Sequence, residues 1–549
     1  MNLLSNLANK VVLAIAFCIS NSTIMAQEPS SLPITQEKLD VRVPTIFIAG
    51  DSTAANGSSN AIGWGKHLSS FFDSEKMKVE NRARGGRSSR TFIHEGLWDD
   101  LLQTVKAGDI VLIQFGHNDG GASDDPSRAR GSLPGIGDET REIDNPITKK
   151  HEAVQTFGWY VRKMIADTRE KQAYPIVLSL TVRNEWRDGH VERGSGRFGG
   201  WSREVAKTEK APFVDLTKII ADRYEQMGQD RVNGLFPRDH THTNDEGAKL
   251  NAELVVSGLK GLRDQLIIGC LNVTGRVIPN ATPDNVVVGA RIGPRMATDQ
   301  AGFQRWLNLP YPADPTLPTL FMIGDSTVRT GRGDGDNGQF GWGDPIEEYF
   351  DRTKLNVVNR AVGGTGARTF RTQKHWDPIL AALRPGDVVL IQFGHNDNGS
   401  KGALKGVGDE TQGRENPATQ EIESVHTFGW YLRQTISEIR ANGAKPILCS
   451  LVPRNIWREG KIARSTNSHA DWSRAVAESE HVDFVDLHEL IASRYDALGA
   501  DTVLPLFADQ RVHTSWAGAV LNAECVNEGL KALPHNPLHP FYVDRELAK

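Results

Sequence analysis

The chain has 549 residues, which is too long for one ordinary domain, and its 39% apolar and 24% charged residues are typical of a soluble globular protein. Its formal net charge of −5 at pH 7 is spread along the chain without a basic stripe, which argues against nucleic acid as a partner. In the body of the chain no apolar run reaches the length of a membrane span, so no membrane span is expected.

Residues 1–26 have the layout of a secretory signal peptide. Lys10 precedes an apolar run, and Ala26 offers a small residue before the expected cleavage point. The alternative is a buried N-terminal strand or helix. A signal peptide predicts a secreted or periplasmic protein. The three cysteines that follow it fit neither a disulfide framework nor a zinc site.

The first element of the body is an apolar run over 44–49, closed by Gly50-Asp51-Ser52-Thr53. The run is short and rich in β-branched and aromatic residues, which predicts a buried strand. A serine just past such a strand lies where open α/β sheets bind their ligands. Taken alone, the motif fits an ordinary strand-to-helix turn better than a functional site, with Asp51 or Ser52 as the N-cap.

The same motifs recur later in the chain. Gly-Asp-Ser-Thr recurs at 324–327, and the stretch 113–119 recurs unchanged at 391–397. The order of the motifs is constant while their spacing changes, which indicates two domains with different loop insertions rather than a solenoid. The predicted divisions are a first domain at 41–268, a connecting segment at 269–315 and a second domain at 316–537. The connecting segment contains strand-like pieces such as 286–288 and could pack on one domain as an extra hairpin.

Within each copy the pattern alternates between strand and helix. The strands expected in the first copy are 44–49, 78–81, 109–115, 175–180 and 212–215, and those of the second copy are 318–323, 355–359, 387–393, 446–451 and 482–485. Helical periodicity covers 151–170 and 422–441. Strands separated by helices predict an α/β fold with a parallel sheet in each domain. The repeated polar motifs follow predicted strand ends, so they are expected to meet at one edge of each sheet.

These motifs contain the groups that ester hydrolysis through a serine requires. Ser52 would be the nucleophile, His242 its base and Asp239 the acid that orients the base if the segment forms a helical turn. The backbone N–H groups of Ser52 and Gly86 and the amide of Asn118 would form the oxyanion hole. Each motif alone fits a simpler role, because glycine pairs and asparagine form turns and Asp-x-x-His is common. Their fixed order, found twice, favours catalysis.

The second copy departs from the first at its last motif. Its matching residues are Ser326, Gly364, Asn396 and His513. Alignment on the histidines places Gln510 opposite Asp239, and the nearest acid, Asp509, stands one position earlier. In a regular helical turn Asp509 would still meet the histidine, whereas in an irregular loop it would not, and a histidine without its acid is a poorer base. We therefore expect the second copy to be weaker or differently selective.

The four motifs resemble those of the SGNH (GDSL-type) hydrolases. Their spellings, Gly-Asp-Ser-Thr, Gly-Gly-Arg-Ser-Ser-Arg-Thr-Phe, Gln-Phe-Gly-His-Asn-Asp and Asp-His-Thr-His-Thr, are similar to those of rhamnogalacturonan acetylesterases, carbohydrate esterase family twelve. The resemblance covers nearly all of both predicted domains. It implies a flavodoxin-like three-layer α/β/α fold, no cofactor and no metal, and removal of acetyl groups from pectic polysaccharide. It also implies the roles already given for Ser52, Gly86, Asn118, Asp239 and His242.

Arginines near the second motif suggest how an acidic sugar would be held. Arg90 and Arg368 correspond in the two copies, whereas Arg87 stands opposite Thr365. Arginine can bind the carboxylate of galacturonate with two parallel hydrogen bonds. We therefore expect Arg87, Arg90 and Arg368 to bind substrate, with the first copy binding acidic sugar better. Surface arginines without a ligand are the alternative.

The sequence thus predicts an exported tandem serine esterase that deacetylates plant cell-wall polysaccharide, rhamnogalacturonan first. Other targets within this class are acetylxylan and short-chain lipid esters. From a different class, the second copy could be a carbohydrate-binding module on a weakened esterase fold, because of Gln510.

Overall fold

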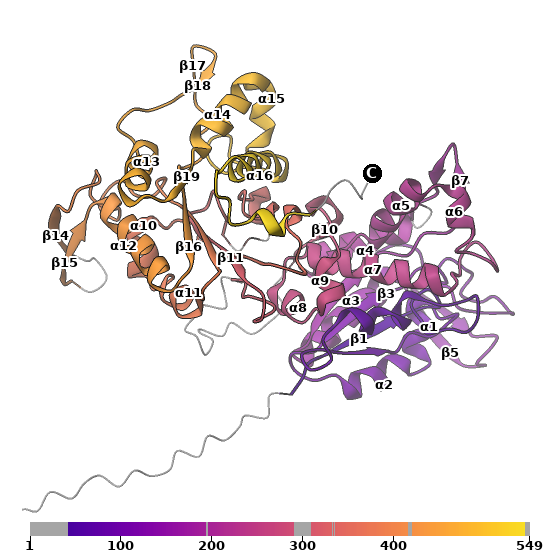
Figure 1. Ribbon diagram of the computed structural model, residues 1–549. Coiled ribbons are helices and arrows are strands. Elements are labelled where there is room, and N and C mark those ends of the chain that lie inside the picture. The colour runs from indigo at the N-terminus through magenta and orange to yellow at the C-terminus, as the bar shows by residue number, and fades with distance from the viewer. Residues whose placement is uncertain are drawn as a thin grey trace, which may run out of the picture. The chain divides into compact units, whose positions relative to one another are not determined.

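The computed structural model describes residues 42–193, 196–289, 309–331, 333, 335–415 and 420–543 (Figure 1). The predicted signal peptide, residues 1–26, and residues 290–308 of the connecting segment lie outside these described residues. Residues 42–289 are called the first copy below and residues 309–543 the second copy.

The first copy is built on a six-stranded sheet with the order β10-β9-β6-β3-β1-β2. Its strands are β1 (Thr45–Gly50), β2 (Lys78–Asn81), β3 (Ile110–Gln114), β6 (Tyr174–Leu178), β9 (Phe213–Val214) and β10 (Val286–Val287). All strands except β10 pair in parallel, in the order β2-β1-β3-β6-β9 of a flavodoxin-like sheet. The five strands predicted for this copy are therefore confirmed to within a few residues.

The second copy repeats this sheet without the added edge strand, in the order β12-β11-β13-β16-β19. Its strands, all parallel, are β11 (Thr319–Gly324), β12 (Asn356–Asn359), β13 (Val388–Gln392), β16 (Lys445–Cys449) and β19 (Asp483–Val485). The predicted fold class, two tandem α/β domains with parallel sheets, is confirmed; the exact domain boundaries stay a prediction.

Helices flank both sheets (Figure 1). Those of the first copy are α1 (Ser89–His94), α2 (Leu97–Thr104), α3 (Phe157–Glu170), α4 (Gly196–Thr208), α5 (Leu216–Met227), α6 (Gln229–Asn233), α7 (Asp245–Gly261), α8 (Gln265–Gly269) and α9 (Val273–Val277), with 3-10 turns η1 (Trp64–Lys66), η2 (Leu68–Phe71) and η3 (Pro283–Asn285). Those of the second copy are α10 (Ala367–Thr372), α11 (Asp377–Ala382), α12 (Phe428–Ala441), α13 (His469–Glu480), α14 (Leu487–Leu498), α15 (Ala500–Val503) and α16 (Trp516–Lys531), with η5 (Asp336–Gly338), η6 (Ile346–Tyr349), η7 (Leu504–Leu506) and η8 (His539–Phe541).

Alternation along the central strands makes each copy a three-layer structure. In β1, Ile46 and Ile48 pack in a core that includes residues of α5 and α7, whereas Phe47 and Ala49 pack in a second core with residues of α1 to α4. Because successive side chains of a strand point to opposite faces, a strand buried on both sides must be apolar throughout, as β1 is. The second copy has the same two cores, around Leu320 and around Phe321.

The helix predicted at 151–170 is shorter than expected. Its first residues form β5 (His151–Gln155), which pairs with β4 (Thr140–Asp144) in an antiparallel hairpin. Helix α3 begins after Thr156, whose side chain accepts a hydrogen bond from the backbone N–H of Trp159. The second copy shows the same correction, with β14 (Thr411–Glu415) and β15 (Ile422–His426) ahead of α12. Short hairpins also join β7 (Trp186–Arg187) to β8 (His190–Val191) and β17 (Trp457–Arg458) to β18 (Lys461–Ile462).

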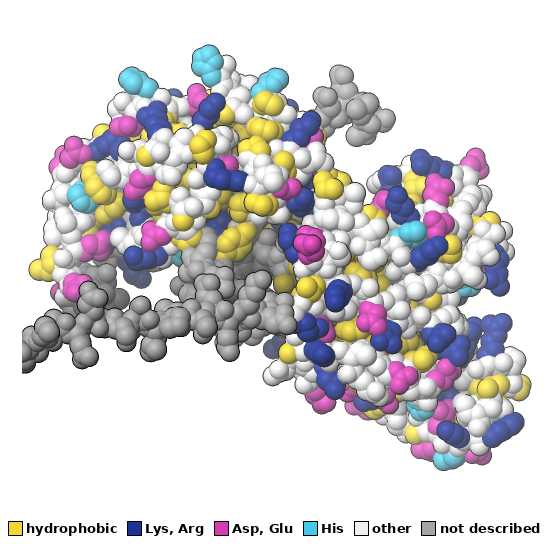
Figure 2. All heavy atoms as spheres, turned by 60° about the horizontal axis from the view of Figure 1, so that its bottom comes forward, with side chains coloured by type: hydrophobic (Ala, Val, Ile, Leu, Met, Phe, Trp, Pro, Cys, Tyr) yellow, Lys and Arg dark blue, Asp and Glu magenta, His cyan; other side chains and the backbone are white. Residues whose placement is uncertain are grey.

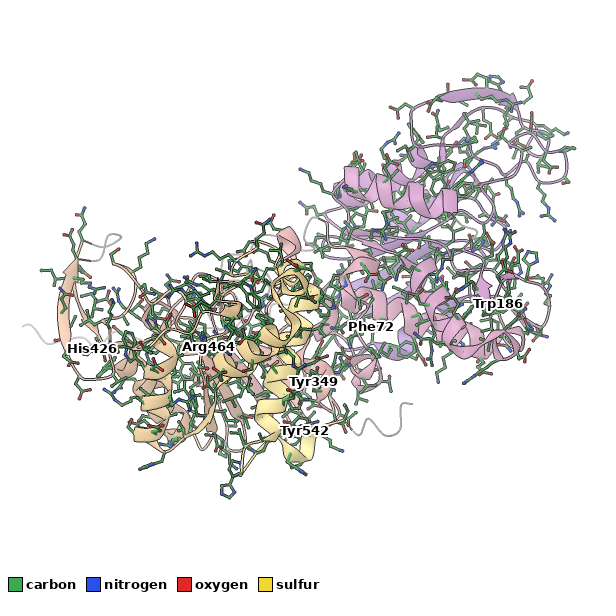
Figure 3. All side chains as sticks on the ribbon, turned by 90° about the horizontal axis from the view of Figure 1, so that it is seen from above. Phe72, Trp186, Tyr349, His426, Arg464 and Tyr542 are labelled. Atoms are coloured by element: carbon green, nitrogen blue, oxygen red, sulfur yellow. The ribbon has the colours of Figure 1, made fainter. Side chains whose placement is uncertain are left out.

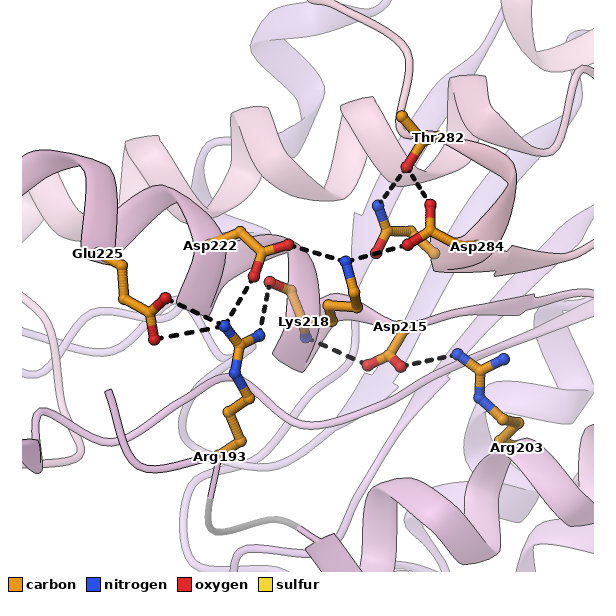
Figure 4. A network of polar contacts seen from close by, with 9 residues as sticks. Arg193, Arg203, Asp215, Lys218, Asp222, Glu225, Thr282 and Asp284 are labelled. Atoms are coloured by element: carbon orange, nitrogen blue, oxygen red, sulfur yellow. Dashed lines mark hydrogen bonds and ion pairs between the residues drawn. The ribbon is translucent and has the colours of Figure 1, made fainter. Parts of the chain in front are cut away.

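Residues 269–289, the first described part of the connecting segment, pack on the first copy and include one edge strand. Strand β10 lies antiparallel to β9 and extends the sheet. One ion pair joins the segment to α5: Lys218 contacts Asp284 in η3 at 3.1 Å, and it also contacts Asp222 of its own helix at 2.9 Å (Figure 4). In the same network Arg203 contacts Asp215, the N-cap of α5, at 2.8 Å. These partly exposed pairs each contribute about 1 kcal/mol or less, so the packing of β10 carries most of the attachment.

The surface mixes both signs of charge. On the face drawn in Figure 2, basic and acidic side chains are interspersed over both copies. Within the described residues, none of the helices combines the length and the apolar character needed to cross a bilayer.

Candidate active site

Ser52 lies in the turn that follows β1. Asp51 closes this turn, because its buried Oδ1 accepts the backbone N–H of Thr53 at 2.9 Å and its hydroxyl at 2.8 Å. Gln114, the last residue of β3, donates to the same hydroxyl at 3.0 Å and accepts the indole N–H of Trp64 at 2.7 Å. This chain of hydrogen bonds ties the turn to the neighbouring strand and holds Ser52 at the sheet edge.

The turn of Ser326 is held in the same way. Asp325 accepts both groups of Thr327, at 2.9 and 2.7 Å, Gln392 donates to that hydroxyl at 3.1 Å, and Trp342 donates to Gln392 at 2.9 Å. Sequence reasoning missed this support. Its signal was a glutamine ending an otherwise apolar strand in both copies, since an amide buried there needs polar partners.

The histidine of the first copy reaches both of its expected partners. His242 Nε2 lies 2.9 Å from Ser52 Oγ, and His242 Nδ1 lies 2.8 Å from Asp239 Oδ2. The segment is a loop rather than the helical turn that was expected. In this loop Asp239 Oδ1 accepts the backbone N–H groups of Thr241 and His242, each at 2.8 Å. The same carboxylate therefore shapes the loop and orients the imidazole.

These hydrogen bonds keep Asp239 ionised. Partial burial acts to raise the pKa of Asp239, but the bonds from the His242 ring and from the N–H groups of Thr241 and His242 outweigh it and lower the pKa to about 2. At neutral pH the carboxylate is thus charged and accepts the proton on His242 Nδ1, which leaves Nε2 free to take a proton from Ser52.

The second copy has a complete triad too, which corrects the alignment made on sequence. His513 Nε2 lies 2.9 Å from Ser326 Oγ, and His513 Nδ1 lies 2.6 Å from Asp509 Oδ2. The counterpart of Asp239 is therefore Asp509, and Gln510 is an extra residue. It adopts φ +65°, in the left-handed region, where a single residue turns the chain outward.

With the inserted residue, the Asp509 carboxylate accepts one more backbone hydrogen bond than the Asp239 carboxylate does. Asp509 Oδ1 accepts the N–H groups of Arg511, Val512 and His513 at 3.0, 2.8 and 2.9 Å. Burial acts to raise the pKa of Asp509, but these bonds and the His513 ring lower it to about 2, as in the first copy. The physical reason for expecting a weaker second site, a histidine without its acid, is therefore not met.

The two remaining motifs lie beside the serine. The backbone at Gly85 passes so close to Ser52 that an added Cβ would be 3.6 Å from the Ser52 Cβ. Gly86 has φ +77°, a conformation that favours glycine. Asn118 donates one Nδ2 hydrogen to the carbonyl of Arg87 at 3.0 Å, which fixes its amide and leaves the second hydrogen for another acceptor.

The second copy matches this arrangement. Gly364 has φ +81°, a Cβ on Gly363 would lie 3.4 Å from the Ser326 Cβ, and Asn396 donates to the carbonyl of Thr365 at 3.0 Å. In both copies the predicted serine, histidine, acid, glycine loop and asparagine thus meet at the same sheet edge.

A buried aspartate next to the asparagine holds the glycine loop in place. Asp119 accepts the backbone N–H of Ser89 at 3.1 Å and its hydroxyl at 2.5 Å. Burial, opposed by these bonds, raises the pKa of Asp119 to about 6. Asp397 accepts the N–H of Ala367 at 2.9 Å, and burial raises its pKa to about 7. No role was predicted from the sequence for Asp119 or Asp397, although each ends the repeated Gly-His-Asn-Asp motif.

In each copy a cleft lies beside the Gly-His-Asn-Asp motif. In the first copy the cleft has a volume of about 820 Å³, and its lining includes His117, Asn118, Arg130, Arg183 and Trp186, the last labelled in Figure 3. The corresponding cleft of the second copy, about 580 Å³, includes His395, Lys405, Arg454, His469 and His488.

Two of the three arginines expected to bind substrate do not face the cleft. Arg90 is fully buried; its Nη1 donates to the carbonyl of Gly131 at 2.7 Å and its Nη2 pairs with Glu152. Arg368 is buried as well and pairs with both oxygens of Glu423, at 3.0 and 2.6 Å. Both side chains hold a loop and a hairpin together, so the prediction that they bind substrate is wrong.

Arg87 is partly exposed, but its charge is already matched. Its Nε lies 2.9 Å from Glu95, and its Nη1 donates to the carbonyl of Gly85 at 3.0 Å. A role in substrate binding stays a prediction for this residue. Among the described residues, no group of three or more His, Cys, Asp or Glu side chains is arranged to hold a metal ion.

Comparison with known families places this geometry in context. The model of the GDSL-like Lipase/Acylhydrolase family matches residues 48–250 and 322–521, one match in each copy. The rhamnogalacturonan acetylesterase of Emericella nidulans is 38% identical over 211 residues, which are 38% of this chain and 82% of that protein. The probable rhamnogalacturonan acetylesterase YesY of Bacillus subtilis is 30% identical over 224 residues, 40% of this chain and 93% of that protein.

Two solved structures are similar to part of this chain. The crystal structure of YxiM from Bacillus subtilis shows 28% identity over 39% of this chain and 56% of that chain, with a TM-score of 0.34. The acetylxylan esterase Axe2 of Geobacillus stearothermophilus shows 18% identity over 39% of this chain and 93% of that chain, with a TM-score of 0.26. Because the family model matches both copies over most of their length, this chain belongs to the GDSL-like Lipase/Acylhydrolase family.

Proposed function

We propose that the chain, a carboxylic ester hydrolase by its family, removes acetyl groups from pectic polysaccharide, with rhamnogalacturonan as the substrate, and does so in both copies. The observation that carries this proposal is the pair of Ser-His-Asp contacts, with a serine Oγ 2.9 Å from a histidine Nε2 in each copy.

The geometry supports an acyl-enzyme mechanism. His242 Nε2 takes the hydroxyl proton as Ser52 Oγ attacks the acetyl carbonyl, and the ionised Asp239 stabilises the imidazolium that forms. The imidazolium then protonates the departing sugar oxygen and leaves an acetyl ester on Ser52. In the second half, His242 takes a proton from water, the resulting hydroxide attacks the ester, and acetate leaves as the proton returns to the serine.

Three donors would stabilise the negative charge on the acetyl oxygen. They are the backbone N–H groups of Ser52 and Gly86 and the second Nδ2 hydrogen of Asn118, with Ser326, Gly364 and Asn396 in the second copy. Losing one donor of this kind raises the barrier by about 3–4 kcal/mol. Because the Arg87 carbonyl already holds the Asn118 amide, this side chain needs to move little when negative charge develops on the acetyl oxygen.

Support for the substrate comes from the relatives. Those named rhamnogalacturonan acetylesterases are 30–38% identical and are matched over 82–93% of their own length. Acetylxylan and other short-chain esters rank second. A binding-only second copy is disfavoured by the contact between Asp509 and His513, which a retired esterase would not need to keep.

We also propose domain limits of 41–268 and 316–537 and export to the periplasm or the medium through residues 1–26. Amino-terminal sequencing of the mature protein tests export, since a start at Gln27 is expected. A chain that keeps Met1 and is recovered only from the cytoplasm would contradict it.

Acetate release tests the function. Wild type is incubated with acetylated rhamnogalacturonan and, separately, with acetylxylan, and the Ser52→Ala/Ser326→Ala double variant serves as the control for both. We expect release from rhamnogalacturonan at least about tenfold faster than from xylan and about 10³-fold or greater loss in the double variant. Equal release by wild type and the double variant would overturn the esterase mechanism, and faster release from xylan would overturn the substrate.

A further inference from the structure

The first copy has a loop at its cleft that the second copy lacks. Eleven residues separate Asp119 from Gly131, whereas four separate Asp397 from Gly402. The two glycines are structural equivalents, because their carbonyls accept the buried guanidinium groups of Arg90 and Arg368 respectively. The seven additional residues of the first copy therefore fall within 120–130, which is called the cleft loop below.

The cleft loop is held in a defined shape. An added Cβ on Gly131 would come within 1.6 Å of the carbonyl oxygen of Gly121, so the two ends of the loop pass in close contact. Asp125 accepts the N–H and the hydroxyl of Ser127 at 2.8 and 2.7 Å, and its own carbonyl accepts the N–H of Ala129 at 2.8 Å. The loop carries Arg128 and Arg130, both of which line the cleft.

Arg130 lies against the glycine loop of the active site. Its Nη1 is 3.4 Å from the carbonyl oxygen of Gly86 and would be 3.8 Å from a Cβ added there. Asn118, which also lines the cleft, is bonded to the carbonyl of Arg87, the next residue. The guanidinium therefore sits beside the groups that would receive the acetyl oxygen.

The charge of Arg130 is not matched by a direct ion pair within the described residues. Three carboxylates act on it through space, those of Asp51, Asp119 and Asp125. Each is already engaged, Asp51 with Thr53, Asp119 with Ser89 and Asp125 with Ser127. A partly exposed guanidinium with free donors at the mouth of an active site is suited to an anionic ligand, above all to a carboxylate with two parallel oxygens.

Outside the cleft loop, the two clefts share two arginines but differ in their acidic side chains. Arg183 and Arg187 of the first copy have counterparts in Arg454 and Arg458, and the first cleft also contains Glu185 and Glu192. The second cleft has no acidic side chain among its described lining residues. What is specific to the first copy is the position of the cation, since the cleft loop places Arg130 beside Gly86, whereas a Cβ added to Gly364 would meet no atom within 4 Å.

We propose that the cleft loop places Arg130 to bind the carboxylate of a uronic acid at or next to the acetylated sugar, so that the first copy selects acidic polysaccharide. This inference rests on the proposed function, because it concerns the substrate of the same site. It also replaces the sequence-based assignment to Arg90, whose buried guanidinium anchors the cleft loop through the carbonyls of Ser123 and Gly131.

The test uses the full chain with Ser326→Ala, so that acetate release reports on the first copy. The substrates are an acetylated rhamnogalacturonan oligosaccharide and the same oligosaccharide with its carboxyl groups reduced to alcohols. We expect kcat/KM for the acidic form to exceed that for the reduced form by about tenfold or more, as for a charge-assisted hydrogen bond. Arg130→Gln should bring this ratio close to one, mainly through KM, and Arg130→Lys should give an intermediate ratio.

Two controls accompany the series. Arg231→Gln removes the same charge from an exposed residue of α6 that does not line the cleft, and should keep the full ratio. Arg130→Gln placed in a Ser52→Ala chain, where acetate release reports on the second copy, should leave the ratio of that copy as it was.

The outcomes separate this inference from the function beneath it. If neither substrate is deacetylated, the proposed function fails. If both are deacetylated at similar kcat/KM, or if Arg130→Gln slows both to the same extent, carboxylate recognition by Arg130 is overturned while the esterase stands.

Discussion

At the scale of single residues, Asp239 and Asp509 have the same role, although they lie at different distances in sequence from their histidines. Each carboxylate bonds the ring of its histidine and caps its own loop, and each pKa is lowered to about 2. The charge that orients the imidazole is therefore present at any pH well above about 2. Equal geometry leads us to expect equal sensitivity to loss of the acid.

We predict that Asp239→Asn, in a chain silenced at the second site by Ser326→Ala, lowers kcat by about 10³- to 10⁴-fold, because the amide favours the wrong imidazole tautomer. Asp509→Asn in a Ser52→Ala chain should cause a loss of the same order. Initial rates of acetate release measure both. A second site that tolerates Asp509→Asn would show that His513 is oriented by something else.

The raised pKa of Asp119 leads to a prediction about how the free energy of unfolding depends on pH. Burial, against the bonds from Ser89, raises its pKa to about 6, above the value of 3.8 for an exposed aspartate. The native state thus binds more protons than the unfolded state between about pH 4 and 6, so the free energy of unfolding falls as the pH rises through this window, by up to about 3 kcal/mol.

Asp119→Asn keeps an oxygen acceptor for Ser89 and removes the titration. Relative to wild type, the variant should gain stability as the pH rises from 4 to 6. Urea unfolding at pH 4.5 and 7 measures the change, with Asp397→Asn as the matched variant, for which the window extends to about pH 7. A wild-type and variant difference that does not change with pH would contradict the raised pKa.

Residue identity was predictable where chemistry restricts the choice. The serine, histidine, glycine and asparagine of both sites could be named from four repeated motifs, because ester hydrolysis needs those groups and strand ends gather them. Gln510 was wrongly aligned with Asp239 because positions were counted back from the histidine. The second copy has one extra residue here, Gln510, in a left-handed conformation, and the acid precedes it. Arg90 was misassigned because sequence does not show burial.

At the scale of elements, the loop that carries the histidine tolerates two lengths. In the first copy the backbone N–H of Asn184 donates to the carbonyl of His240, two residues before His242, at 2.7 Å. In the second copy Asn455 donates to Arg511, two residues before His513, at 2.9 Å. The histidine end of the loop is therefore anchored identically, and the length difference lies entirely at Gln510.

Deleting Gln510 should consequently preserve the second site. In a Ser52→Ala chain we expect kcat/KM within about threefold of the parent, because Asp509 then takes the spacing of Asp239 and a strained left-handed residue is removed. Acetate release checks this. A loss approaching that of Asp509→Asn would mean that the longer loop is required for the contact with His513.

The elements themselves were predictable to different degrees. Strands β1 and β3 are buried along their whole length and apolar except for Thr45 and Gln114, so pattern alone located them. Hairpin strand β5 was taken for the start of α3, because its partner β4 lies in a stretch whose side chains are mostly exposed and carry no strand pattern. Strand β10 was identified as strand-like, but its partner β9 is distant in sequence.

At the scale of the whole molecule, the chain carries two complete copies of one site. The sequence predicted two sites of unequal activity, but the described contacts of the two triads are closely similar. The histidine–acid distance is 2.8 Å in the first copy and 2.6 Å in the second, and the serine–histidine distance is 2.9 Å in both. The copies differ instead in the walls of their clefts, which determine what binds. We therefore expect two active serines with different preferences.

The most direct test is covalent labelling of the full chain with a serine-directed fluorophosphonate, followed by intact mass measurement. The account predicts two additions in wild type, one in Ser52→Ala, one in Ser326→Ala and none in the double variant, because each histidine activates its own serine. A single addition in wild type that Ser52→Ala abolishes, or labelling that survives in the double variant, would contradict it.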